Sequence, residues 1–117
     1  MKKIYHLSTC DTCKRILMDL QPLDKFELQD IKNEAITDSQ LQEMKQLSGS
    51  FEALFSKRAR LYKEKGLAAK SLTEADYEKL ILEHYTFLKR PVILFDDKIF
   101  IGNSKKVIET AKENIHP

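Results

Sequence analysis

The chain has 117 residues, 42% of them hydrophobic, which suits one folded domain with one core over residues 1–117. Twenty basic residues against eighteen acidic ones give a net charge of +2, too small a balance to indicate direct nucleic-acid binding by itself. The sequence shows no signal peptide and no long apolar run, so we expect a cytoplasmic protein with no membrane contact.

The first part of the chain predicts a strand, a helix and a second strand. Residues 3–7 form a short apolar segment, and a helical pattern follows from about Cys13 to Leu20. Pro22 ends this helix, and the alternating pattern from Phe26 predicts a second strand that ends near Ile31. Strand, helix and strand at this length form a βαβ unit, so the two strands should be parallel.

The middle of the chain, residues 37–85, predicts only helices. Thr37 and Gln40 have the spacing of a capping box at the start of a helix that stops near Gly49. A short helix ends at Gly66, and Thr73 can cap a further helix. We therefore expect an all-helical insert between the second and third strands.

The last part of the chain predicts a β-hairpin and a final helix. Val92–Phe95 and Lys98–Ile101 are apolar runs separated by two aspartates, and Ser104 can cap the helix that follows. The complete order is that of an α/β protein with a thioredoxin-like mixed sheet of about four strands and a helical insert.

Cys10 and Cys13 are the only cysteines, and they stand at the predicted strand-to-helix turn. The positive end of the helix dipole and the free N–H groups there stabilise a thiolate at the first position. The second thiol, on the first helical turn, is close enough to attack a disulfide made by the first. A C-x-x-C near a βαβ unit in a cytoplasmic protein favours a catalytic or sensing redox pair.

Two other interpretations of the cysteine pair stay open. A zinc site needs two further ligands, and the three histidines, His6, His84 and His116, do not show metal-ligand spacing, so we expect no metal. Free cysteines also serve as small buried apolar residues. Such a structural pair has no reason to stand at the opening of a helix, which favours the redox interpretation.

Arg90 and Pro91 directly precede the predicted third strand. In thioredoxin-like folds a cis-proline at this point faces the cysteine pair, so we expect a cis bond at Pro91. Arg90 would then lie near Cys10, where a fixed positive charge lowers the thiol pKa and offers a fork to an oxyanion. The alternative is an ordinary solvated arginine.

Three segments together resemble the arsenate reductase (ArsC) family, which includes the Spx transcriptional regulators. They are His6-x-x-x-Cys10 before a helix, Leu54–Arg58, and Leu88–Ile93, and the resemblance covers nearly the whole chain. It implies a thioredoxin-like domain in which Cys10 is the nucleophile and Arg90 binds an oxyanion. Arsenate reductases of the family carry further arginines; this chain offers Arg58 in a slightly different register and has Gly102-Asn103 at another such position.

Two functions from different classes follow from this resemblance. The first is a thiol reductase in which Cys10 attacks a small oxyanion or a disulfide, Cys13 resolves, and Arg90, Pro91 and Arg58 line the substrate. We expect no bound cofactor, with glutathione and glutaredoxin, or thioredoxin, as electron donor. The second is an Spx-like redox-sensing regulator that contacts the RNA polymerase α subunit, with Cys10 and Cys13 as its switch.

Overall fold

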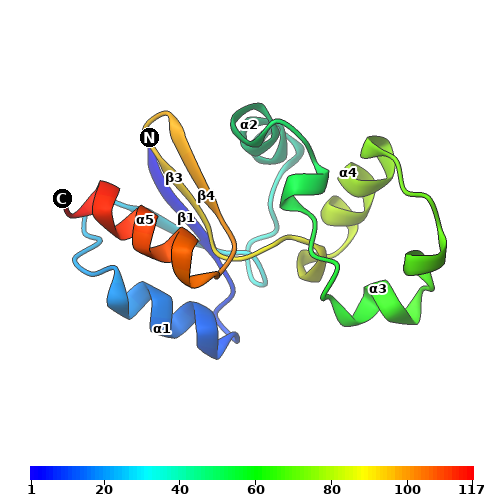
Figure 1. The fold of residues 1–117 in the computed structure, drawn as a ribbon, viewed down its shortest axis with the longest axis horizontal. Helices are drawn as coiled ribbons and strands as arrows, with labels where there is room; N and C mark the ends of the chain where they lie inside the picture. The colour runs from blue at the N-terminus through cyan, green and yellow to red at the C-terminus, as the bar shows by residue number, and fades with distance from the viewer. The chain divides into compact units, whose positions relative to one another are not determined.

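The computed structural model describes residues 1–117, which divide into two compact units. The first, the sheet unit, consists of Met1–Glu34 and Arg90–Pro117. The second, the helical unit, is the continuous segment Ala35–Lys89. Figure 1 traces both units along the chain. The helical unit corresponds to the predicted insert and extends it by two residues at the start and four at the end.

The sheet unit contains a four-stranded sheet in the order β2-β1-β3-β4. β1 runs parallel to β2 and antiparallel to β3, and β3 and β4 form an antiparallel hairpin. The predicted mixed sheet of the α/β class, with helices inserted between β2 and β3, is therefore confirmed. The elements of this unit are β1 (Lys2–His6), α1 (Asp11–Asp19), β2 (Glu27–Asp30), β3 (Val92–Phe95), β4 (Lys98–Ile101) and α5 (Lys105–Ile115).

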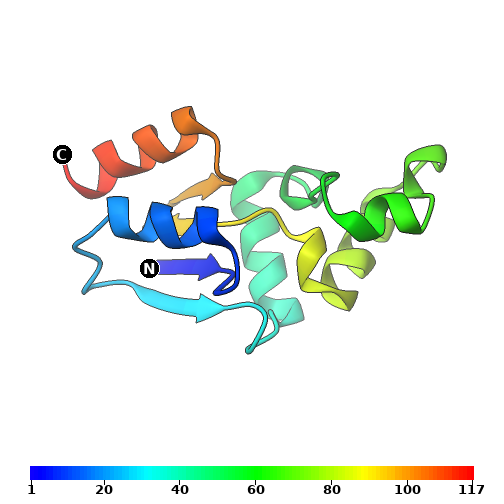
Figure 2. The same ribbon diagram turned by 90° about the horizontal axis from the view of Figure 1, so that it is seen from below.

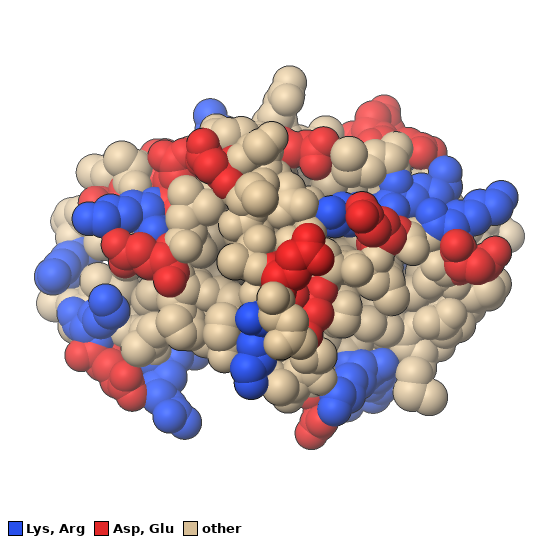
Figure 3. All heavy atoms as spheres, turned by 180° about the vertical axis from the view of Figure 1, so that it is seen from behind, with Lys and Arg blue, Asp and Glu red and all other residues tan.

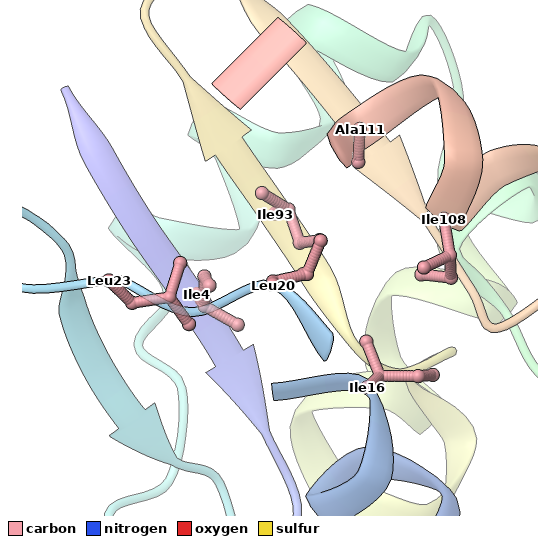
Figure 4. Close-up of a cluster of buried hydrophobic side chains, with 7 residues drawn as sticks. All are labelled: Ile4, Ile16, Leu20, Leu23, Ile93, Ile108 and Ala111. Atoms are coloured by element: carbon pink, nitrogen blue, oxygen red, sulfur yellow. The ribbon is translucent and has the colours of Figure 1, made fainter. Parts of the chain in front are cut away.

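Both helices of the sheet unit lie on the same face of the sheet, as Figure 2 shows. Ile4 of β1 pairs in register with Ile93 of β3, and both side chains are fully buried beneath the helices. Figure 4 shows the apolar cluster that joins the two layers. Its buried members are Ile4, Ile16, Leu20, Leu23, Ile93, Ile108 and Ala111. This packing holds α1 firmly against β1, the strand that leads into it.

One helix boundary differs from the sequence prediction. The helix expected from about Cys13 begins at Asp11, because Cys10 has the extended backbone of an N-cap residue, with φ −97° and ψ 115°. The hairpin strands have the predicted bounds, and Asp96 turns between them at a positive φ of 56°. The Ser104 side chain accepts a hydrogen bond from the Val107 N–H, so it caps α5 as expected.

The helical unit is organised by capping boxes and a cluster of aromatic rings. Thr37 with Gln40, and Thr73 with Asp76, each form a reciprocal capping box. The Phe55 ring centroid lies 4.8 Å from that of Tyr77, 5.3 Å from that of Phe87 and 5.9 Å from that of Tyr62. The elements of this unit are α2 (Asp38–Ser48), η1 (Glu52–Leu54), α3 (Arg60–Glu64), η2 (Leu67–Ala69), α4 (Glu74–Glu83) and η3 (Tyr85–Phe87).

The surface carries charges of both signs. Figure 3 shows acidic and basic side chains interspersed over the face that it displays. Many of the cations form exposed ion pairs, such as Lys112 with Asp19 at 2.9 Å and Lys2 with Asp96 at 3.5 Å. None of the helices combines the length and apolar character needed to cross a membrane.

The packing of the sheet unit leads to a prediction of its stability. Ile93→Ala should lower the free energy of unfolding by about 2–5 kcal/mol, because it removes a fully buried side chain and leaves a cavity beneath both helices. Leu28→Ala is the matched control, since Leu28 is 44% exposed on β2, and it should cost less than about 1 kcal/mol. Urea unfolding followed by circular dichroism measures both, and equal losses would contradict the assigned core.

Candidate functional site

A tight turn after β1 places Cys10 at the start of α1. The Cys10 N–H donates to the Leu7 carbonyl at 3.0 Å, and the Lys14 N–H donates to the Cys10 carbonyl at 3.1 Å. Cys10 is therefore the N-cap residue of a nine-residue helix, and its side chain is partly exposed. The thiol stands where the N–H groups of the first helical turn have no partner within the helix.

The surroundings of Cys10 favour its thiolate. Burial acts to raise the pKa of the Cys10 thiol, but other groups outweigh it and hold this pKa below its ordinary value. The largest opposing contributions are hydrogen bonds to its sulfur from the N–H and thiol of Cys13, followed by the Thr12 N–H. The positive charge of Arg90 lowers the Cys10 pKa further. The Cys10 thiol is thus ionised more readily than an ordinary cysteine.

Cys13 is the opposite kind of thiol. It lies on the first turn of α1 with only 1% of its surface exposed. Burial is the main reason that its pKa rises to about 11, and the negative charge of Cys10 adds to the rise. A hydrogen bond from the Leu7 backbone and the charge of Arg90 act in the other direction without compensating. The structure contains no disulfide, and of the two free thiols Cys10 is the one whose surroundings favour the anion.

Arg90 and Pro91 enter the sheet unit beside the cysteine turn. β3 pairs with β1 so that Val92 lies opposite Tyr5, which places the two preceding residues next to the end of β1. The Arg90–Pro91 bond is cis, as expected, and the Pro91 carbonyl accepts a hydrogen bond from the Gly102 N–H at 2.9 Å. Arg90 is partly buried, and its charge acts on both thiols.

Arg58 belongs to the helical unit. It is exposed in the short segment between η1 and α3, two residues after the Ser56 N–H donates to the Phe87 carbonyl at 2.7 Å. Cys10, Cys13, Arg90 and Pro91 all belong to the sheet unit. A role for Arg58 at the thiols therefore stays a prediction.

The sequence interpretation missed Ser8 and Asp30, which support the cysteine turn. The Ser8 N–H donates to Asp30 Oδ1 at 3.1 Å. A signal for this contact was available, because β1 and β2 are parallel and their carboxyl ends meet at one edge of the sheet. A carboxylate at the end of β2 is then next to the loop that follows β1. Nowhere in the chain do three or more histidine, cysteine or acidic side chains gather as a metal ion would require.

The chain is similar to known proteins in sequence and in fold. The profile of the ArsC family matches residues 5–111, and no curated protein matches the sequence significantly. A Bacteroides fragilis structure described as ArsC family related superposes with a TM-score of 0.78 at 21% identity, covering 93% of this chain and 95% of the other. An arsenate reductase from Vibrio cholerae superposes with a TM-score of 0.72 at 22% identity, covering 96% of this chain and 95% of the other. A possible arsenate reductase from Streptococcus mutans gives a TM-score of 0.75 at 23% identity, with coverages of 95% and 97%.

The thiol electrostatics lead to a prediction of pH dependence. The rate of iodoacetamide alkylation at Cys10, measured by mass spectrometry against pH, should rise with a midpoint below about 8.5, the value of a free cysteine. Arg90→Gln should move this midpoint upward, because it removes a positive charge that favours the thiolate. Arg15→Gln is the matched control on the exposed face of α1 and should leave it unchanged. A wild-type midpoint at or above 8.5 would contradict the assignment of Cys10.

Proposed function

The chain belongs to the ArsC family, and we propose that it is a thiol-dependent reductase in which Cys10 is the nucleophile and Cys13 the resolving thiol. The observation that supports this most is the contrast between the two cysteines. One is a partly exposed thiol with a lowered pKa, and the other is a buried thiol with a pKa of about 11 on the same helical turn. A single-chain reductase needs such an order, because the two thiols must react in sequence.

The first step is nucleophilic attack on a small oxyanion such as arsenate. The Cys10 thiolate forms a bond from its sulfur to arsenic, and one arsenate oxygen leaves as water after taking up two protons. Backbone N–H groups at the start of α1 and the Arg90 guanidinium bind the anionic oxygens during this step. The partly buried position of Arg90 increases the effect of its charge.

The second step uses Cys13. When Cys10 is bonded to arsenic it no longer carries the negative charge that helps to raise the Cys13 pKa, while the positive charge of Arg90 stays. Cys13 can then lose its proton and attack the Cys10 sulfur. The sulfur–sulfur bond forms, the sulfur–arsenic bond breaks, and its electron pair leaves with arsenic as arsenite. The same two thiols reduce a disulfide substrate in the same order.

The third step restores the two thiols. An external dithiol, or two molecules of a monothiol, donates two electrons and two protons to the Cys10–Cys13 disulfide and leaves as a disulfide. Thioredoxin, glutaredoxin or glutathione are the donors that we propose, and no bound cofactor is needed for this chemistry. Pro91 shapes the site beside the thiols for the extended substrate or donor, and Arg58 is a further candidate for contact with an anion.

A redox-sensing regulator is the second candidate function. It is favoured by the same observation, because a buried and a partly exposed thiol three positions apart also suit a reversible disulfide switch. The partner would be the RNA polymerase α subunit. A pull-down of this subunit by reduced and by oxidised protein, set beside the turnover assay below, separates the two functions. Redox-dependent capture without turnover favours the regulator.

Substitution of each cysteine tests the order of the reaction. With arsenate and either glutathione plus glutaredoxin or thioredoxin as donor, Cys10→Ser should reduce turnover to background. Cys13→Ser should allow one attack and then stop, so the protein should accumulate as a Cys10 adduct. In the wild type, mild peroxide should remove two hydrogens as the Cys10–Cys13 disulfide forms, as measured by mass spectrometry. Cys13→Ser protein with full turnover in both donor systems would contradict the resolving role.

Substitution of Arg90 tests anion binding. Arg90→Ala should reduce kcat/KM for arsenate by about 10²- to 10³-fold, which corresponds to the loss of about 2–4 kcal/mol of transition-state stabilisation. The assay is run at a pH above the alkylation midpoint of both proteins, so that the thiolate fraction is equal. A small neutral disulfide serves as control substrate and should lose much less rate. Equal losses for both substrates, with a lowered melting temperature, would contradict the assignment.

A further inference from the structure

We propose that Asp30 is a positioning residue for Cys10, acting through the hydrogen bond that its carboxylate accepts from the turn between β1 and α1. The inference rests on the proposed function only in taking Cys10 as the reactive thiol. Asp30 is the last residue of β2, and in the parallel register of the sheet it lies beside His6, the last residue of β1. It therefore stands at the sheet edge from which the cysteine turn departs.

The contacts of Asp30 are all directed at the loops of this edge. Its Oδ1 accepts the N–H of Ser8 at 3.1 Å and that of Lys32 at 3.2 Å, and its Oδ2 accepts from Asn33 Nδ2 at 2.6 Å. Hydrogen bonds from the side chain and the backbone of Ser8 help to hold the Asp30 pKa below its ordinary value, and the nearby His6 acts in the same direction. The carboxylate is thus charged at neutral pH and already has well-placed donors.

The hydrogen bond from Ser8 to Asp30 fixes the middle of the turn, between two residues that other contacts hold. Leu7 is fixed at the end of β1 and accepts the Cys10 N–H, and Cys10 is fixed as the N-cap of α1. Ser8 lies between these two anchors, and its N–H points to β2 instead of into the turn. Asp30 therefore ties the middle of the turn to the sheet.

The geometry of the turn matters because the lowered pKa of Cys10 depends on the direction of the hydrogen bonds that its sulfur accepts. Its thiolate is stabilised by the N–H groups of Thr12 and Cys13, and hydrogen bonds weaken steeply when their angle is lost. The charged or titratable groups named among the main influences on the Cys10 pKa are Cys13 and Arg90. Asp30 thus acts through the geometry of the turn, so a neutral acceptor of the same length should replace it.

Four variants separate acceptor geometry from charge. Asp30→Asn keeps an oxygen at the position of Oδ1 and removes the charge, so Cys10 alkylation should follow the wild-type pH profile. Asp30→Glu keeps the charge but displaces the oxygens by one methylene, and Asp30→Ala removes the acceptor. Both should raise the midpoint of the profile. Asn33→Ala is the matched control, because it removes a contact of Asp30 without affecting Ser8.

The expected size follows from thiol chemistry. At a pH well below the alkylation midpoint, a rise of one unit in the Cys10 pKa lowers the thiolate fraction about tenfold, while the more basic thiolate reacts about threefold faster. Alkylation at such a pH should therefore slow by about threefold for each unit. Alkylation needs no substrate, donor or partner, so absence of arsenate turnover would count against the proposed function and leave this inference standing.

Three results would overturn the proposal. One is a wild-type profile for Asp30→Ala, with urea unfolding showing that the variant is folded. Another is an equal shift for Asp30→Asn and Asp30→Glu, which would show that Asp30 does not act through a correctly placed acceptor. The third is an equal shift for Asn33→Ala, which would indicate general loosening of this edge. If Asp30→Ala does not fold, the comparison of Asp30→Asn with Asp30→Glu decides the question alone.

Discussion

The position of Cys10 as the N-cap of α1 is the constraint on which the chemistry of this protein depends. An N-cap residue has extended backbone, so the chain can leave β1, turn within three residues and start a helix without a longer loop. The helix stays in place because Ile16 and Leu20 are buried against the sheet residues Ile4 and Ile93. The apolar core therefore fixes the direction in which the first N–H groups of α1 point, and these groups lower the pKa of the Cys10 thiol.

The same helix makes two thiols of one residue type chemically different. They stand only three positions apart, yet one is at the open end of the helix and the other is on the side that packs inward. Free N–H groups and Arg90 favour the anion at the first position, and loss of water disfavours it at the second. No additional base is required to create this contrast, because helix geometry and burial produce it.

Much of this arrangement could be predicted from the sequence, because local signals and tertiary structure agree. Apolar periodicity and capping residues located nearly every element, and the βαβ pattern with a terminal hairpin determined the sheet. The start of α1 was placed two residues late, since a cysteine at the N-cap lacks the usual signal of a serine, threonine or aspartate. Asp30 was missed for a different reason: its contact with Ser8 joins residues 22 apart and depends on strand register, which no local pattern contains. The position of Arg58 relative to the thiols depends on the arrangement of the helical unit, and the motif Leu54–Arg58 does not predict that arrangement.

Burial of Cys13 also restricts which reactions the pair can undergo. A thiol with 1% of its surface exposed and a pKa of about 11 is almost entirely protonated and out of reach of an external electrophile at neutral pH. Its neighbour on the same turn is the one electrophile that can reach it, and only after Cys10 has itself reacted. In the proposed reaction this order protects the pair from oxidation at the wrong sulfur and prevents substrate from binding to Cys13. The energetic cost of burying a polar thiol is small, since the uncharged form behaves as an apolar group. In the proposed reaction, the fold can therefore keep Cys13 buried and protonated at little cost in stability until Cys10 has formed an adduct.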